Sequence, residues 1–341
     1  MANIQEVANA AGVSTASVSR YLSGNHVRSH AAIARAIDDL GYTPSVVARS
    51  LKSGRHGSIG VIVPDVTNPF FSSLVKGIER EARISDYQVL LGNSDENSPQ
   101  QDALLGALSQ RTDGIIMVPI VEEGRSVLSL SRIGIPVVLV DRDVHSPGDF
   151  DRVLVDNLSG ARQAIEHLVA LGHTRIAFIS GPLHSTPGRA RHEGFMAAMA
   201  AHGVPVAEEL VCYSDFRESG GYQSMNDVWS APQRPTAVFI ANNLMTIGAL
   251  NALHDLQVDV PGDISVIGFD DLSFAALLNP PLTAIRHPDV EQGATAARLL
   301  LARVLRSGDA KPRSVTFPVE LVVRGSTAPV MRPARAANDA S

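Results

Sequence analysis

Cysteine is nearly absent from this chain, since Cys212 is the only one in 341 residues. A single cysteine excludes an intrachain disulfide and a zinc site built from several thiolates. Long apolar runs are also missing, and no stretch approaches the roughly 20 residues that a membrane helix needs. The first residues carry no apolar signal core. We therefore expect a soluble cytoplasmic protein without a membrane partner.

Sequence patterns that would indicate an enzyme are missing as well. We find no glycine-rich phosphate loop, no metal-ligand cluster and no serine–histidine–acid arrangement at the ends of the predicted strands. The 11 histidines are scattered and lack the spacing of metal ligands. We expect no catalysis, no metal and no cofactor.

Basic charge is scarce overall, and the formal net charge is −6. That value argues against a general nucleic-acid binder, but the distribution is uneven. Residues 1–58 hold six basic side chains, Arg20, Arg28, Arg35, Arg49, Lys52 and Arg55, against the acids Glu6, Asp38 and Asp39. This segment is therefore +3 and the rest of the chain is −9. Such a division predicts that only the N-terminal head meets phosphates.

The head has the pattern of a helix-turn-helix. Residues 4–13 predict a helix ending at a turn around Gly12, and residues 14–22 predict a second helix. Asn3 and Glu6 have the spacing of a capping box, Ser14 can cap the second helix, and Ser29 can cap a third that reaches Leu40. The second helix carries small polar residues and one arginine, which suits a DNA groove. We interpret residues 1–44 as a DNA-binding head.

Residues 45–53 predict a short helix between Pro44 and Gly54. A helix of this length is marginal alone, so it needs a second copy of itself or DNA. We assign residues 45–57 to a hinge helix and a flexible joint.

Apolar strands alternate with helices from residue 58 onward. The strands are predicted at 59–63, 89–91, 115–118, 137–140, 176–179, 237–240 and 265–268, and the helices at 70–83, 100–110, 159–171, 189–202 and 245–256. This alternation is typical of parallel sheets covered on both faces, and its restart after Asp156 predicts two similar lobes with a cleft between them. The fold class is thus α/β, with a two-lobed domain over 58–330 and a disordered tail over 331–341.

Short motifs along most of the chain resemble the LacI/GalR family of bacterial transcription regulators. They are VANAAGVS at 7–14, VSR at 18–20, LGYTP at 40–44, VARSL at 47–51, NPFF at 68–71, LGHTRI at 171–176, RHEGF at 191–195 and IGFDD at 267–271. Each is weak alone, but together they occur in order and at the family's spacing. The resemblance implies a three-helix head with a hinge helix, followed by a domain like the periplasmic sugar-binding proteins.

By this resemblance, Thr15, Ala16 and Arg20 face base edges in the major groove of double-stranded operator DNA. Contacts to phosphates are assigned to Ser14, Ser17, Ser19 and Asn25, and further DNA contacts to the hinge residues Ala48, Arg49, Leu51 and Lys52. Leu51 is expected to wedge between central base pairs from the minor groove. The alternatives are that Arg20 contacts only a phosphate and that Leu51 packs only against its partner helix. Ser45 departs from the family, which usually has asparagine there.

The resemblance also places a small-molecule site in the cleft. Its predicted residues are Asn68, Phe70, Phe71, Asp141, Arg142, Arg191, Phe216, Asn242, Asp270 and Arg286. Aromatic faces with carboxylates, amides and guanidinium groups suit a polyol, whose hydroxyls both donate and accept. Other interpretations stay open: Phe71 in the core, an Asp141–Arg142 structural ion pair, and Asn242 with Asn243 as a helix cap. Asn243 is a departure, because the family usually has aspartate.

We therefore predict a transcriptional regulator that acts as a repressor and a homodimer on a pseudo-palindromic operator, associated with the nucleoid. Its effector is predicted to be a monosaccharide, with a pentose such as ribose favoured and a sugar acid or sugar phosphate as the alternative. A transport-type sugar-binding protein is the other candidate, and the head, the hinge and the missing signal core argue against it. The C-terminal residues contain no leucine heptad, which disfavours a tetramer.

Overall fold

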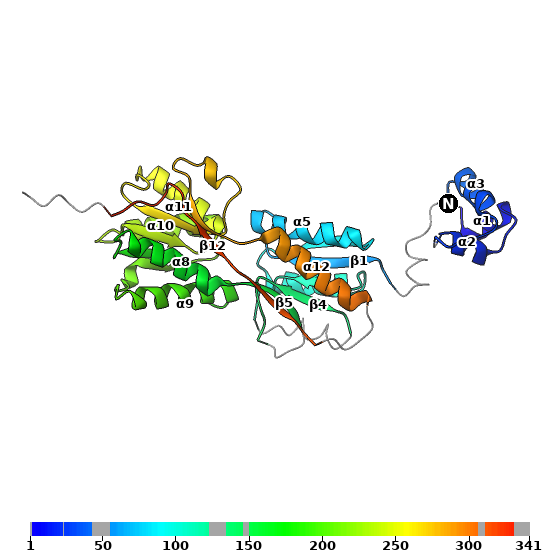
Figure 1. Cartoon of the computed structure of the whole chain (residues 1–341), viewed down its shortest axis with the longest axis horizontal. Coiled ribbons are helices and arrows are strands. Elements are labelled where there is room, and N and C mark those ends of the chain that lie inside the picture. Colours follow the sequence, from blue (N-terminus) through cyan, green and yellow to red (C-terminus); the bar gives the residue numbers. More distant parts are fainter. Residues whose placement is uncertain are drawn as a thin grey trace, which may run out of the picture. The chain divides into compact units, whose positions relative to one another are not determined.

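The computed structural model describes residues 2–22, 24–42, 55–122, 134–145, 150–305 and 311–330. The chain divides into two compact units, Met1–Gly57 and Ser58–Ser341, which we call the head and the body (Figure 1). Predictions for residues 43–54, including Ser45, Ala48, Arg49, Leu51 and Lys52, lie outside the described residues. Predictions for the tail, residues 331–341, also lie outside the described residues.

Three short helices form the head: α1 (Ile4–Ala10), α2 (Thr15–Leu22) and α3 (His30–Leu40). The predicted capping box is present, because Asn3 accepts from the backbone of Glu6 while the Glu6 side chain accepts from the backbone of Asn3. Gly12 makes the turn with φ of +63°, and Ser14 caps α2 through its hydroxyl. These contacts confirm a helix-turn-helix fixed largely by local sequence.

Two details of the head differ from the prediction. Helix α1 ends at Ala10 rather than Val13, because the chain already turns at residues 11–13. Ser29 precedes α3, but its side chain makes no capping hydrogen bond there. A small core holds the three helices together, and it includes the fully buried Val7, Val18 and Ile33.

The body contains two six-stranded sheets, one in each lobe. Lobe 1 holds β1 (Ser58–Val63), β2 (Gln88–Asn93), β3 (Ile115–Met117), β4 (Val137–Val140), β5 (Asp151–Val155) and β11 (Ser314–Phe317), in the order β11-β5-β4-β3-β1-β2. Lobe 2 holds β6 (Ile176–Ser180), β7 (Val211–Tyr213), β8 (Ala237–Ile240), β9 (Ser265–Phe269), β10 (Thr283–Arg286) and β12 (Glu320–Val322), in the order β12-β10-β9-β8-β6-β7. All pairings are parallel except β10 with β12. The predicted parallel α/β architecture is confirmed, with that one antiparallel exception.

Helices cover both sheets. Lobe 1 carries α5 (Pro69–Ile84), α6 (Ser98–Ser109) and α12 (Asp289–Leu305), and lobe 2 carries α8 (Asn157–Ala170), α9 (Thr186–Ala201), α10 (Glu218–Trp229) and α11 (Asn243–Asp255). Figure 1 shows α12 beside α5. A Cβ on Gly77 of α5 would lie 1.9 Å from the carbonyl oxygen of Val290 in α12. Only glycine permits so close a helix pairing.

The lobes are not consecutive in the sequence. The chain leaves lobe 1 after β5, returns to it between β10 and α12, and crosses again between β11 and β12. The restart after Asp156 was correctly predicted, whereas the return of α12 and β11 to lobe 1 was not. Nothing in their local periodicity says which sheet they join, because that choice depends on long-range pairing.

The described residues contain no helix that is both long and apolar enough to cross a membrane.

Candidate functional site

Helix α2 presents the predicted DNA-reading residues of the head. Ala16 and Arg20 are exposed, and Thr15 is half-buried. Among the predicted phosphate contacts, Ser14 and Asn25 are exposed, while Ser17 and Ser19 are half-buried. Ser14 is also engaged locally, since its hydroxyl lies 3.2 Å from the amide of Ser17. The surface is thus polar and accessible, and the individual contacts to DNA remain predictions.

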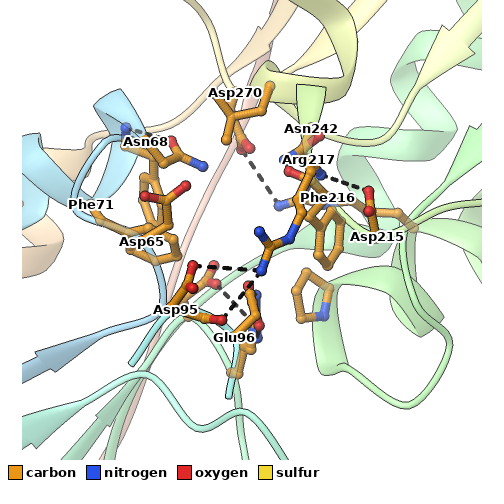
Figure 2. Close-up of a pocket in the computed structure, with 16 residues that line it drawn as sticks. Asp65, Asn68, Phe71, Asp95, Glu96, Asp215, Phe216, Arg217, Asn242 and Asp270 are labelled. Atoms are coloured by element: carbon orange, nitrogen blue, oxygen red, sulfur yellow. Dashed lines mark hydrogen bonds and ion pairs between the residues drawn. The ribbon is translucent and has the colours of Figure 1, made fainter. Parts of the chain in front are cut away.

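A pocket in the body brings together nine of the ten residues predicted for the cleft. It is lined by Asp65, Asn68, Phe70, Phe71, Asp95, Glu96, Asp141, Arg142, Pro187, Arg191, Asp215, Phe216, Arg217, Asn242, Leu244 and Asp270 (Figure 2). Both lobes contribute, and several of these residues follow the carboxyl ends of strands, where parallel sheets place their ligand crevices.

Backbone strain is concentrated at this pocket. Seven described non-glycine residues have positive φ, and five of them, Asp95, Glu96, Asp141, Phe216 and Asp270, line the pocket with φ between 50° and 68°. Residues with a side chain rarely adopt this backbone conformation, and it persists only where the surrounding fold enforces it. The clustering supports a functional role for the pocket, because the strain falls where strands end and side chains must turn inward.

Arg142 is held mainly by Glu96. Its two terminal nitrogens lie 2.8 and 2.6 Å from the Glu96 carboxylate, whereas its Nε lies 4.0 Å from Asp141 and has no hydrogen-bond partner. The predicted Asp141–Arg142 pairing is therefore secondary to one that the sequence did not reveal. Burial raises the pKa of Asp141 above its ordinary value, although Arg142 partly opposes the shift.

Arg191 is fixed by four groups of lobe 2. Its Nε donates to Asn157 at 2.8 Å, a terminal nitrogen donates to the carbonyl of Ala241, and its Cζ lies 3.6 Å from the centre of the Phe269 ring. Its other terminal nitrogen lies 3.5 Å from Asp270. These contacts hold the Arg191 guanidinium in one position, so it presents a fixed positive charge at the pocket.

Asp270 differs from Asp141 in its charge environment. One of its oxygens lies 2.8 Å from Nε2 of His287 and 3.5 Å from Arg191. Burial alone would raise the pKa of Asp270, but the two cations outweigh burial and hold it below its ordinary value. Asp270 is thus an ionised acceptor at the pocket wall.

The two asparagines of the pocket cap helices. Asn242 accepts from the amide of Met245 at the start of α11 and donates to the carbonyl of Phe216 at 3.0 Å, which supports the capping interpretation. The oxygen of Asn68 accepts from the amide of Phe70 and from the side chain of Asn243, at 2.9 and 2.8 Å. Asn243 therefore joins lobe 2 to lobe 1.

Aromatic side chains stand on facing walls of the pocket. Phe71 enters from lobe 1 and Phe216 from lobe 2 (Figure 2). Phe70 and Phe71 contact each other with ring centres 4.8 Å apart, and both also belong to the lobe 1 core. The core interpretation of Phe71 and the pocket interpretation therefore both hold, because one face of a side chain can pack while another lines a cavity.

Arg286 is the one predicted residue that lies outside the pocket. Its side chain is 53% exposed and pairs with Glu320 across the β10–β12 edge. The prediction that it points into the cleft is wrong, because at the end of β10 the side chain turns to Glu320 of β12 and does not line the pocket.

The sequence did not reveal seven lining residues: Asp65, Asp95, Glu96, Pro187, Asp215, Arg217 and Leu244. The only available signal was position, since Asp95 and Glu96 follow β2 and Asp215 follows β7. Nothing local distinguishes them from ordinary loop residues.

The lobes are closed on each other in this structure. Besides the Asn68–Asn243 bond, Arg217 lies 3.6 Å from Asp95, and Arg189 of lobe 2 makes a bidentate pair with the buried Glu122 of lobe 1. The pocket encloses about 520 Å³ between protein atoms when its open mouth is counted, a size that suits a compact ligand.

No group of three or more histidine, cysteine, aspartate or glutamate side chains in the described ranges is arranged to hold a metal ion.

Two family models match the chain. Residues 3–45 match the bacterial regulatory proteins of the lacI family, and residues 165–327 match a periplasmic binding protein-like domain. The ribose operon repressor of Escherichia coli K12 is 37% identical over 331 residues, covering 96% of this chain and 100% of that protein. The repressor PurR of Yersinia pestis is 35% identical over 335 residues, covering 96% and 97%.

Solved structures agree with these matches. The lac repressor dimer bound to operator and the anti-inducer ONPF has a TM-score of 0.84 at 27% identity, covering 96% of this chain and 99% of that one. A LacI family regulator from Enterococcus faecium with bound ribose has a TM-score of 0.71 at 31% identity, covering 80% and 100%.

Proposed function

The chain belongs to the lacI family of bacterial regulatory proteins, and on that premise we propose that it is a repressor controlled by a small neutral polyol. A pentose such as ribose is the first candidate. The observation that carries the effector assignment is the single pocket that gathers nine predicted cleft residues. Members of the family are DNA-binding regulators, so the protein is not an enzyme.

The charges of the pocket favour a neutral ligand over an acid or a phosphate. Six carboxylates line it against three arginines. Each arginine already faces a carboxylate: Arg142 faces Glu96, Arg191 faces Asp270 and Arg217 faces Asp95. An anionic ligand would enter an excess of negative charge without a free cation to neutralise it. Hydroxyl groups, in contrast, can donate to carboxylates and accept from guanidinium groups.

The named relatives point in the same direction. One is a ribose operon repressor, and a structural neighbour of this chain contains bound ribose. Stacking of an apolar sugar face between Phe71 and Phe216 fits their positions on opposite walls. We therefore place a pentose between these two rings, with Asp141 and Asp270 as acceptors for its hydroxyls.

Exposed apolar side chains support a homodimer. Ile84, Leu90 and Leu91 of lobe 1 are 74%, 37% and 49% exposed, and Leu277 of lobe 2 is 85% exposed. These side chains are available to an interface with a second copy of the chain. Such a copy, related by a twofold axis, would present two heads to a pseudo-palindromic operator. The lac repressor structure noted above is itself a dimer on operator.

The test joins sugar binding with DNA binding on one purified protein. D-ribose, D-ribonate and D-ribose 5-phosphate are titrated by calorimetry, and DNA sites selected from a random pool are titrated by fluorescence anisotropy. We expect D-ribose to bind, the two anions to bind at least about tenfold more weakly, and ribose to weaken DNA binding. Tighter binding of either anion would overturn the neutral-ligand assignment.

Arg20→Ala separates the two activities. Arg20 is exposed on α2, and loss of a base contact costs about 1–3 kcal/mol. DNA affinity should therefore fall at least about fivefold, while D-ribose affinity stays unchanged. If this variant kept the wild-type DNA affinity, Arg20 would not contact DNA as proposed.

A further inference from the structure

His287 lies in a covalent link between the lobes. It follows β10 of lobe 2 and precedes α12 of lobe 1, with only Pro288 between it and the first residue of that helix. Its side chain is 1% exposed. Its ring meets an aromatic side chain from each lobe, with centres 5.3 Å from Phe70 and 6.1 Å from Phe269. No water-accessible face is left to solvate the imidazole.

Both ring nitrogens face carboxylates. Nε2 lies 2.8 Å from Asp270, which lines the effector pocket, and Nδ1 lies 3.0 Å from Asp289 in the first turn of α12. A neutral imidazole has only one N–H, so it can donate to only one of these groups. Donation to both requires the imidazolium.

The neighbouring Gln292 fits the imidazolium when its side-chain amide is rotated, because in the orientation present its nitrogen faces Nδ1 as a donor. The side-chain nitrogen of Gln292 is placed 2.7 Å from Nδ1, while its oxygen is buried without a partner. The two ends of an amide are exchangeable by rotation. Rotation brings the unpaired oxygen to the Nδ1 proton of an imidazolium and removes a contact between two donors.

We propose that His287 is a positioning residue of the effector site. As an imidazolium held between Asp270 and Asp289, it aims the Asp270 carboxylate into the pocket and ties that carboxylate to the first turn of α12. This inference rests on the proposed effector function of the pocket. It goes further by naming a residue outside the pocket lining that binding depends on.

The packing of α12 extends the link to the opposite wall of the pocket. Val290, next to Asp289, lies against Gly77 of α5 at backbone contact. Helix α5 begins at Pro69 and carries Phe70 and Phe71 in its first turn. The chain Asp270–His287–Asp289 therefore connects a carboxylate of lobe 2 to the helix that supplies the aromatic wall of lobe 1.

The charged groups around His287 make its charge testable by pH. They are Asp270 after β9 and Asp289 in α12, with Asp141 after β4 and Arg191 in α9 beyond Asp270. Burial lowers the pKa of His287, but the two carboxylates outweigh it and raise the pKa to about 9. With a pKa of about 9, His287 is expected to change charge between pH 7 and 10.

The experiment uses the full-length protein and D-ribose, with His287→Gln as the main variant. Glutamine keeps a neutral donor near Asp270 but cannot carry the charge. We expect the Kd for D-ribose to rise about tenfold at pH 7, because a charge-assisted hydrogen bond becomes neutral. We also expect the wild-type affinity to weaken above pH 9, and the variant to lack that dependence. An unchanged Kd in the variant would overturn the proposal.

His173→Gln is the matched control. His173 is equally buried and bonded through both nitrogens, but to the Thr236 hydroxyl and the Ala328 carbonyl, away from the pocket. Its replacement should leave D-ribose affinity unchanged. An equal loss of D-ribose affinity in both variants would mean that His287 contributes only to packing, and it would overturn the proposal.

A second measurement does not depend on the sugar. Imidazole nitrogen chemical shifts, assigned by the signals lost in His287→Gln, report directly whether this ring carries two protons. We expect two protons at pH 8, and a fall of at least about one pH unit in the titration midpoint when Asp289→Asn removes one carboxylate. A neutral ring at pH 7 would overturn the proposal. If the wild type does not bind D-ribose at all, the pentose assignment fails, and these shifts alone decide the state of His287.

Discussion

The two lobes have the same strand order, yet they give equivalent carboxylates opposite chemistry. Asp141 follows β4 and Asp270 follows β9, and these strands occupy the same place in their sheets. Their side chains are 8% and 11% exposed, and their φ values are nearly equal, 66° and 68°. The pKa of Asp141 is nevertheless raised and that of Asp270 lowered. The shared fold fixes the backbone, while the neighbours decide the charge.

The neighbours differ for a definite reason. Asp270 faces Arg191 and His287, so two cations compensate the cost of its burial. Asp141 has Arg142 beside it, but the terminal nitrogens of that arginine are turned toward Glu96. Lobe 2 therefore offers a stabilised anion, and lobe 1 offers a carboxylate whose charge is costly unless a ligand hydrogen-bonds to it.

Asp270→Asn should have the largest effect. It removes one charge from a buried group of three and leaves Arg191 and His287 facing a neutral amide, at a cost of about 3 kcal/mol. We expect D-ribose affinity to fall about 100-fold or more in calorimetry. DNA binding without sugar should survive. If D-ribose affinity stayed within twofold of wild type, Asp270 would not contribute to binding, and the proposed difference between the lobes would be wrong.

Stability should depend on pH in a direction set by lobe 2. The raised pKa of His287, about 9 in the folded protein against about 6.5 unfolded, contributes stability that is complete below pH 6.5. That contribution, of order 3 kcal/mol, is lost as the pH rises through 9. The lowered pKa of Asp270 acts at the other end, with stability lost as the pH falls below its ordinary range. Urea unfolding between pH 6 and 10 checks the first part, and a flat profile would contradict it.

Asp141→Asn should have a smaller effect on binding and the opposite effect on stability. Loss of one charge-assisted hydrogen bond to the ligand weakens D-ribose binding about tenfold. Because burial disfavours the charged form of Asp141, removal of the charge should leave the melting temperature at pH 7 unchanged or raised. Calorimetry and thermal unfolding measure the two. A fall in melting temperature as large as that of Asp270→Asn would show that the lobes do not differ as described.

Arg286→Ala should have the smallest effect. Arg286 and Glu320 form an exposed pair, and such pairs contribute about 0–1 kcal/mol. D-ribose affinity should stay within about twofold of wild type, because the side chain lies outside the pocket. If D-ribose affinity fell more than tenfold, Arg286 would contribute to the effector site and its placement outside the pocket would be wrong.

Much of this molecule could be predicted from its sequence because the deciding signals are local. The capping box at Asn3 and Glu6, the turn at Gly12 and the apolar runs of β1 and β4 each depend on residues close in the chain. The family motifs then placed most of the cleft residues at the ends of these strands. The sequence by itself therefore determined the head, the α/β class and the identity of nine pocket residues.

Only the tertiary structure decided how those residues are paired. Glu96 and Arg142 are 46 positions apart, and His287 bonds across 17 residues to Asp270. Their meeting depends on which strands are neighbours and on where the chain crosses between lobes, and neither has a periodic signal. Protonation follows from these contacts, since a carboxylate in a buried site takes its charge from whichever groups the fold brings within a few ångströms. That is why two aspartates at equivalent strand ends differ.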